Sequence, residues 1–147
     1  MLKNKIVKKR INSTVKYIDS LYENYSKLNF IREDFGYIKP HSNEKSIEDL
    51  NQDLNHLFRN RRTKPLIFKD NVGYIIKQEY TEDKGFHIHA IFIYDGQKVQ
   101  KDVYKANQIG KYWENEITKG KGSYHNCNQN KYRNNGIGLI DYKDKVE

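Results

Sequence analysis

The chain has a single cysteine, Cys127, among its 147 residues. One thiol excludes an internal disulfide and a zinc cluster built from cysteines. It also fits a reducing compartment, so we expect a cytoplasmic protein. The chain lacks an apolar run long enough to span a bilayer and a secretory hydrophobic segment, so we expect no membrane partner.

Internal repeats, low-complexity linkers and shifts in composition are also lacking. A chain of 147 residues suits one domain, so we expect a single domain over residues 1–147. Isoleucine, leucine, phenylalanine and tyrosine are plentiful enough to build its core. The N-terminus is basic but soon becomes amphipathic, and we interpret it as part of the fold.

Acidic residues are outnumbered: 27 lysines and arginines face 19 aspartates and glutamates, which gives a net charge of +8. Such a charge either keeps a small protein soluble or marks a surface that binds nucleic acid. The chain also holds 12 tyrosines, which suit both half-buried positions and stacking on bases. Charge alone does not separate these two interpretations.

Hydrophobic periodicity predicts an α+β protein, with helices packed on one antiparallel sheet. A capping box, Ser46 to Asp49, opens the second helix, which stops before Pro65. The polar stretch from Ser123 to Asn135 predicts a loop. The expected helices cover residues 5–24, 47–64 and 101–118, and the expected strands cover residues 28–38, 72–80, 86–94 and 137–140.

The tripeptide His87-Ile88-His89 lies in the apolar run of the strand over residues 86–94. Residues two apart on a strand point to the same face, so the two imidazoles lie side by side. Imidazole is a common ligand of divalent metals. By chance such a pair also occurs without a metal, so the neighbouring strand decides between the two interpretations.

A hairpin that pairs Tyr80 with Phe86 places Glu79 opposite His87 and Lys77 opposite His89. Glu79 then becomes a third ligand, and the open positions of the ion accept a phosphate and water. We expect Mg²⁺ or Mn²⁺ there, with Lys77 as a nearby cation. A slip of one residue in the register would turn Glu79 to the other face.

Two basic segments are candidates for contact with DNA. The first follows the second helix, where cations either meet the helix dipole or contact phosphates. The second combines cations, asparagines and aromatic residues, as base-contacting loops do. His125 in the second segment is a metal-binding residue type, but its spacing does not require that role. The candidates are Arg59, Arg61, Arg62 and Lys64 in the first segment, and Lys119, Lys121, Tyr124 and Arg133 in the second.

An ordered set of motifs resembles the HUH endonuclease superfamily, and within it the inovirus-type replication proteins and prophage proteins of the YagK/YfjJ type. The set covers most of residues 28–142. It comprises Gly73 to Tyr80, the His-Ile-His-Ala strand that ends in Tyr94-Asp95-Gly96, Ile109 to Trp113, Lys119 to Gly122, and Gly136-Ile137-Gly138.

This resemblance implies a ferredoxin-like or RRM-like fold, with His87 and His89 as the metal pair and Glu79 as the acidic ligand. It implies metal-dependent nicking of single-stranded DNA or a DNA hairpin, at the start of rolling-circle replication of a phage, prophage or plasmid. A tyrosine would attack the phosphorus and leave a 5′-phosphotyrosyl enzyme and a free 3′-hydroxyl.

Family members carry the tyrosine in a Tyr-x-x-Lys pattern after the histidine strand. Tyr142 and Lys145 match this pattern, so they are the candidate nucleophile and its partner. Relatives have more chain after the last strand, so the nucleophile is either Tyr142 or a tyrosine beyond residue 147. Two alternatives stay open: a DNA-binding module or regulator that does not cleave, and a phosphoesterase that uses water.

Overall fold

A computed structural model describes residues 2–133 and 137–144 of the chain. The elements labelled η are 3₁₀-helices, except η2, which is a π-helix. In chain order the elements are α1 (Leu2–Tyr22), β1 (Lys27–Tyr37), α2 (His41–Glu44), α3 (Ile47–Arg59), η1 (Asn60–Arg62), α4 (Pro65–Phe68), β2 (Asn71–Thr81), β3 (Gly85–Asp95), α5 (Asp102–Tyr112), η2 (Trp113–Ile117), β4 (Gly122–Asn126), η3 (Cys127–Arg133), β5 (Gly138–Asp141) and η4 (Tyr142–Asp144).

Five strands form one antiparallel sheet, which confirms the predicted α+β class. Four of them lie in the order β2-β3-β1-β4, and β5 pairs with β1 on the same side as β4. The chain runs β1-α3-β2-β3-α5-β4 through these four strands, as in a ferredoxin-like fold. Strand β1 is therefore central, and its two halves have different neighbours on one side.

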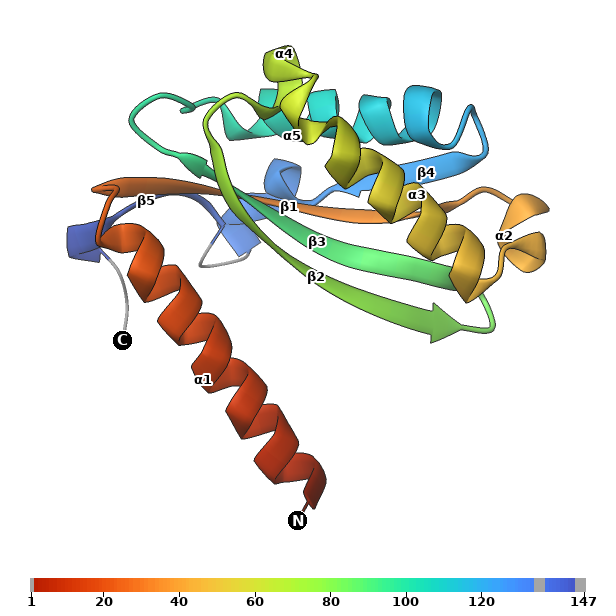
Figure 1. Ribbon diagram of the computed structural model, residues 1–147, viewed down its shortest axis with the longest axis horizontal. Helices are drawn as coiled ribbons and strands as arrows, with labels where there is room; N and C mark the ends of the chain where they lie inside the picture. The colour runs from red at the N-terminus through yellow and green to blue at the C-terminus, as the bar shows by residue number, and fades with distance from the viewer. Residues whose placement is uncertain (1, 134–136, 145–147) are drawn as a thin grey trace.

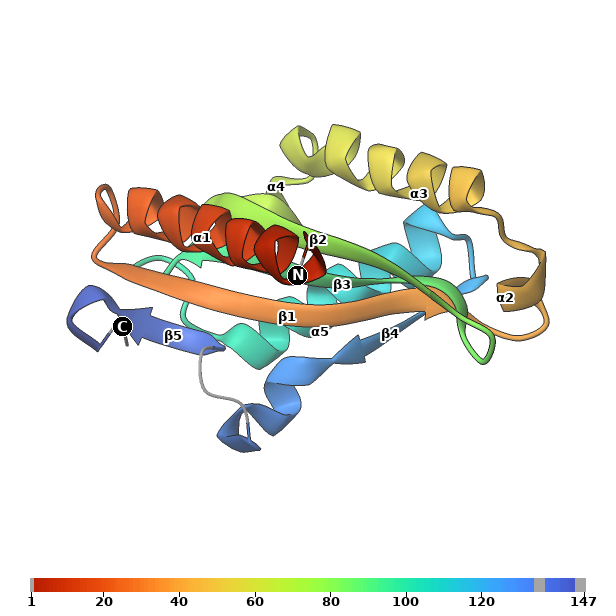
Figure 2. The same ribbon diagram turned by 90° about the horizontal axis from the view of Figure 1, so that it is seen from below.

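The two faces of the sheet are covered differently. Helices α3 and α5 pack on one face, where Ile88, Phe92 and Trp113 belong to the main core. The other face has a smaller core under α1, which includes Tyr22, Leu28 and residues of β3. Figures 1 and 2 show α1 alone on this second face, toward one end of the sheet. We call this second face the open face.

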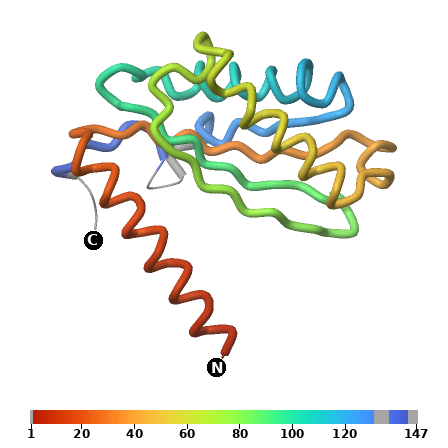
Figure 3. The backbone as a smooth tube through the Cα atoms, in the orientation of Figure 1, coloured from red at the N-terminus to blue at the C-terminus, as the bar shows by residue number. Residues whose placement is uncertain are grey.

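Helix α1 confirms the predicted N-terminal helix but leaves most of its apolar residues exposed. Only its last turns, with Ile18, Leu21 and Tyr22, pack against the sheet. The helix slopes away from the strands toward its N-terminus (Figure 3), so Ile6 and Ile11 remain exposed. The amphipathic pattern predicted the helix correctly, but it does not specify how far the helix contacts the sheet. No helix among the described residues is long and apolar enough to cross a bilayer.

The loop predicted from Ser123 to Asn135 is wrong for its first four residues, and its last two lie outside the described residues. Residues 122–126 form strand β4, which pairs with the second half of β1. Tyr124 faces the helices, where its ring lies against α5. Asn126 is buried, and its side-chain amide donates a hydrogen bond to the Val103 carbonyl oxygen on α5. A buried asparagine satisfied by a helix backbone carries no hydrophobic signal, so the pattern concealed this strand.

The capping box of α3 is confirmed, since Asp49 and Ser46 exchange hydrogen bonds between side chain and backbone. The third predicted helix is also confirmed, although its last turn is the π-helix η2. Trp113 begins that turn and stacks on Phe35 of β1 with ring centroids 5.0 Å apart. This stacking fixes α5 and η2 against the central strand.

Glu33 on β1 is a buried acid on the helix-covered face. Its side chain is fully buried, and neither carboxyl oxygen has a hydrogen-bond partner among the residues that the structure describes. Burial raises the pKa of Glu33 well above its usual range, and the charge of Asp34 adds to the shift. Burial therefore favours the protonated, uncharged form of this carboxyl in the folded protein.

We expect Glu33→Gln to stabilise the protein at alkaline pH relative to the wild type. Below the ordinary glutamate pKa of 4.5 the carboxyl is protonated in both the folded and the unfolded state. Above that pH only the unfolded chain ionises, so the wild type loses up to about 1.4 kcal/mol of unfolding free energy per pH unit until the folded pKa is reached. Urea unfolding at several pH values measures this difference.

The matched control is Glu82→Gln, which removes an exposed carboxyl from the turn between β2 and β3. It should leave the pH dependence of unfolding close to that of the wild type. If the Glu33→Gln protein and the wild type show the same pH dependence, Glu33 is not held protonated in the folded state.

Candidate metal centre

The β2–β3 hairpin brings together the three residues predicted as metal ligands. Glu79 pairs with His87, Lys77 with His89 and Tyr80 with Phe86, which confirms the predicted register. The strands extend one residue further than predicted, so the loop is Glu82 to Lys84. All three ligand residues lie on the open face, beyond the part that α1 covers.

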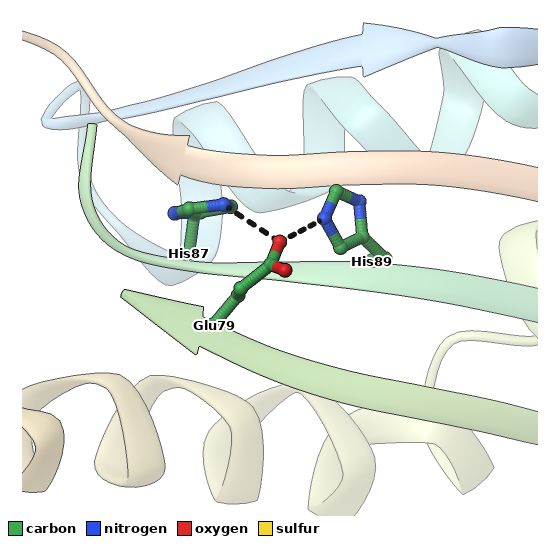
Figure 4. Close-up of side chains that lie close together, drawn as sticks. All are labelled: Glu79, His87 and His89. Atoms are coloured by element: carbon green, nitrogen blue, oxygen red, sulfur yellow. Dashed lines mark hydrogen bonds and ion pairs between the residues drawn. The ribbon is translucent and has the colours of Figure 1, made fainter. Parts of the chain in front are cut away.

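Figure 4 shows both imidazoles directed at the carboxylate of Glu79. The Nε2 atom of His89 lies 2.6 Å from Oε2 of Glu79, and the Nε2 atom of His87 lies 3.3 Å from the same oxygen. One ligand atom from each residue lies within 4.8 Å of the others. His87 is buried, whereas the other two side chains are partly exposed, so the site opens to solvent on one side.

The Nδ1 atom of each histidine is held by a partner outside the triad. In His87 it donates to the carbonyl oxygen of Gly85, 2.9 Å away. Gly85 has a φ of 69°, a left-handed conformation that favours glycine and closes the hairpin. In His89 the Nδ1 atom donates to Oδ1 of Asp34 on β1, 2.7 Å away. Both Nε2 atoms are thereby left to face Glu79.

The carboxylates of Asp34 and Glu79 shift the pKa of His89, and His89 shifts the pKa of Glu79. The hydrogen bond to Asp34, and after it the bond to Glu79, raises the pKa of His89, although partial burial acts in the opposite direction. The bond from His89 in turn lowers the pKa of Glu79. An ion that takes the Nε2 atom of His89 must replace its proton, so metal binding and proton release are coupled.

The two distances from Glu79 to the histidines are compatible with a shared metal ion. Neighbouring ligands of an octahedral ion bound at about 2.1 Å lie about 3.0 Å apart. The distances of 2.6 and 3.3 Å from Glu79 to the two histidines bracket that value. Second partners on both Nδ1 atoms are also typical of metal-binding histidines. Two nitrogens and one oxygen suit Mn²⁺ and other transition metals, and they leave positions for further oxygen ligands.

Lys77 lies beside the triad as predicted. Its Nζ atom is 3.7 Å from Oε1 of Glu79, and its side chain is mostly exposed. An exposed pair of this kind contributes little to stability. The ammonium group instead places a positive charge at the edge of the open side.

The basic segment after α3 lies away from the triad, on the side of the sheet that the helices cover. Arg61 lies over the ring of Tyr74, and that ring stacks on Phe58 of α3 with centroids 4.3 Å apart. Lys64 pairs with Glu116 at 3.1 Å. Two of the four cations therefore have partners within the fold, while Arg59 and Arg62 are exposed.

The second basic segment is divided between the surface and the interior. Lys119 and Lys121 are exposed in the turn before β4. Tyr124 is not an exposed stacking residue, because its ring packs over Gly110 of α5 and its hydroxyl donates to Asn107. Arg133 ends η3, and its side chain lies outside the described part.

The structure does not bring Tyr142 to the triad. Its backbone N–H donates to Ser26, just before β1, and its ring packs near Tyr22. Asp34, which contacts His89, lies eight residues further along the chain than Ser26. At about 3.3 Å per residue this separation is roughly 26 Å. Lys145, its predicted partner, lies outside the described residues.

Asp34 is the site residue that the sequence analysis missed. It lies 55 positions before His89, and only the pairing of β1 with β3 brings the two together. A signal was present: acidic Asp34 stands in a strand-like segment at an odd spacing from Ile31 and Phe35, so it points away from the face that they occupy. The order of the strands is needed to read it, and local periodicity does not give that order.

Searches of family models, curated proteins and solved structures found no match to this chain. The relation to the HUH superfamily therefore stays a prediction from motifs.

We expect Asp34→Asn to weaken Mn²⁺ binding about tenfold while the fold is kept. The amide keeps the size of the side chain but removes the charge that orients and polarises the imidazole of His89, and losing such a partner costs about 10–100-fold in affinity. His87→Ala should abolish binding, since it removes a ligand. Titration calorimetry with Mn²⁺ measures both effects.

Asp53→Asn is the matched control, because Asp53 accepts a hydrogen bond from Tyr37 on the other face of the sheet. It should bind Mn²⁺ like the wild type. Unchanged binding in Asp34→Asn would show that Asp34 does not support the site, and unchanged binding in His87→Ala would show that the metal binds elsewhere.

Proposed function

We propose that this protein binds Mg²⁺ or Mn²⁺ through Glu79, His87 and His89 and cleaves single-stranded DNA, as an initiator of rolling-circle replication would. One observation carries the proposal: two oriented imidazoles and a carboxylate converge on one point at an uncovered end of the sheet. A metal at that point is open to a phosphate on its solvent side.

The charge around the triad supports a phosphate as the bound group. An ion held there would offset negative charge on the phosphate oxygens. Lys77 stands at the edge of the same site, and the whole chain carries a net charge of +8. The carboxylates of Glu79 and Asp34 together would offset the two charges of the ion, and Lys77 then leaves a positive charge at the edge of the site.

The ordered motifs support single-stranded DNA as the substrate. The order of strands and helices agrees with the ferredoxin-like fold that the resemblance to HUH endonucleases implies. The pair His87 and His89 lies on a central strand, opposite an acidic residue, as that resemblance requires. Single-stranded DNA fits an open sheet face more readily than duplex DNA does, because the backbone of a single DNA strand bends over a shallow surface.

The place of Tyr142 bears on the attacking group. A hydroxyl that attacks a phosphate must lie within about 3.5 Å of the phosphorus. Tyr142 lies at the other end of β1, and the hydroxyls of Tyr37 and Tyr124 donate to α3 and α5 on the other face. This separation argues against Tyr142 as the nucleophile and leaves two candidate attacking groups, a tyrosine beyond residue 147 and a water molecule.

Cleavage of circular single-stranded DNA tests the proposal without knowledge of a target sequence. One break converts a circle to a linear strand, which a denaturing gel resolves. We expect linear product with Mn²⁺ and none with EDTA. We expect His89→Ala to lower the rate by about 100-fold or more, because a lost ligand costs more than a lost supporting partner.

The controls are His56→Ala, which removes an imidazole from α3, and Tyr142→Phe. Both should cleave like the wild type. A protein–DNA adduct that Tyr142→Phe abolishes would show that Tyr142 is the nucleophile after all. If the protein binds the circular DNA but does not break it, cleavage is wrong and the protein is a DNA-binding module.

A further inference from the structure

The triad occupies only one side of a wider pattern on the open face. Residues directly opposite on paired strands share a face, so the strand registers place Lys77, His89, Asp34 and His125 in one row across β2, β3, β1 and β4. Neighbouring strands lie about 4.8 Å apart, so His125 is roughly 10 Å from His89. The row thus continues past the triad onto β4.

Gly36 leaves a gap beside that row. A Cβ atom added to Gly36 would lie 3.5 Å from Cβ of His87 and 3.7 Å from Oγ of Ser123. Gly36 therefore lies between a metal ligand on β3 and a hydroxyl on β4, with no side chain of its own to fill the space. We call this space the Gly36 groove.

The groove is a real concavity with polar walls. A hollow of about 520 Å³ extends from His87 and His89 over Gly36 to Ser123 and His125. At its hairpin end it is bordered by Lys84, and also by Lys39, which pairs with exposed Asp83 at 3.7 Å. Its lining balances Lys39 and Lys84 against Asp34 and Asp83, so an anion here would depend on hydrogen-bond donors and on the charge of a metal in the triad.

The two polar side chains on β4 are available for a ligand. Among the described residues, no hydrogen bond is made by the hydroxyl of Ser123 or by the imidazole of His125. Ser123 is half-buried at the floor and His125 is exposed at the rim. Both groups donate hydrogen bonds that suit phosphate oxygens.

We propose that the Gly36 groove is a second phosphate site, which holds the phosphodiester next to the one that is cleaved. This inference rests on the proposed function. The single-stranded DNA then runs from the triad across β1 to β4. Its backbone lies over Gly36, and Ser123 and His125 donate hydrogen bonds to its next phosphate. Contacts of this kind position a strand without reading its bases.

Gly36→Val tests the groove. The backbone of Gly36 has no positive φ and the added Cβ meets only ordinary contacts, so a β-branched residue is compatible with the strand. Two methyl groups then fill the groove while all three ligands remain. We expect at least a tenfold loss of affinity for a fluorescent oligothymidine, measured by anisotropy, with unchanged Mn²⁺ affinity. Gly36→Ala should lose less.

Ser123→Ala/His125→Ala makes the same test without adding bulk, and it keeps the proposal falsifiable if Gly36→Val does not fold. It should weaken oligothymidine binding about fivefold to tenfold, again with Mn²⁺ binding intact. Ser20→Ala/His56→Ala removes the same two chemical groups from α1 and α3, and it should bind oligothymidine like the wild type.

The outcomes separate the groove from the function. If the wild type binds and cleaves single-stranded DNA while both groove variants bind it equally well, the groove proposal is wrong and the proposed function stands. If the wild type binds no single-stranded DNA, the proposed function and the groove proposal fail together. Loss of Mn²⁺ binding in the folded double variant would make Ser123 and His125 part of the metal site instead.

Discussion

The register of the β2–β3 hairpin is the constraint on which the candidate site depends. Glu79 meets His87 and His89 only because it stands opposite His87. A slip of one residue would send its carboxylate to the face under α3. Burial on both faces opposes such a slip: Ile76 packs toward the main core, and Ile75 packs toward the smaller core under α1. The turn at Gly85 closes the hairpin and also supplies the carbonyl oxygen that orients His87.

Local patterns were sufficient to predict this hairpin and its triad. Alternation along a strand fixes which side chains share a face, and a short loop fixes which residues stand opposite each other, so Glu79 was found from residues close to it in sequence. Asp34 and Tyr142 were different, because their positions follow from pairings between distant strands. Tyr124 packs over Gly110, a contact that depends on where α5 crosses the sheet. The local sequence pattern does not predict where α5 crosses the sheet.

The two ends of the open face have different roles. At one end α1 covers the sheet, β5 pairs with β1 and the smaller core forms, and Tyr142 packs there against Tyr22. At the other end α1 does not cover the sheet, and each of the strands β2, β3, β1 and β4 carries one polar residue of the row. The same strand β1 thus contributes Leu28 to a core and Asp34 to the site. A central strand that is apolar at one end and polar at the other explains why the candidate metal ligands lie together at the polar end.

The central claim is that one divalent ion binds the Nε2 atoms of both histidines and the carboxylate of Glu79. Anomalous diffraction from crystals grown with Mn²⁺ tests it most directly, because the scattering locates the ion itself. The account predicts one strong peak on the open face, about 2.1–2.3 Å from all three ligand atoms, with the Nδ1 atom of His89 still bonded to Asp34. A peak elsewhere, or none at this position at saturating Mn²⁺, would contradict it.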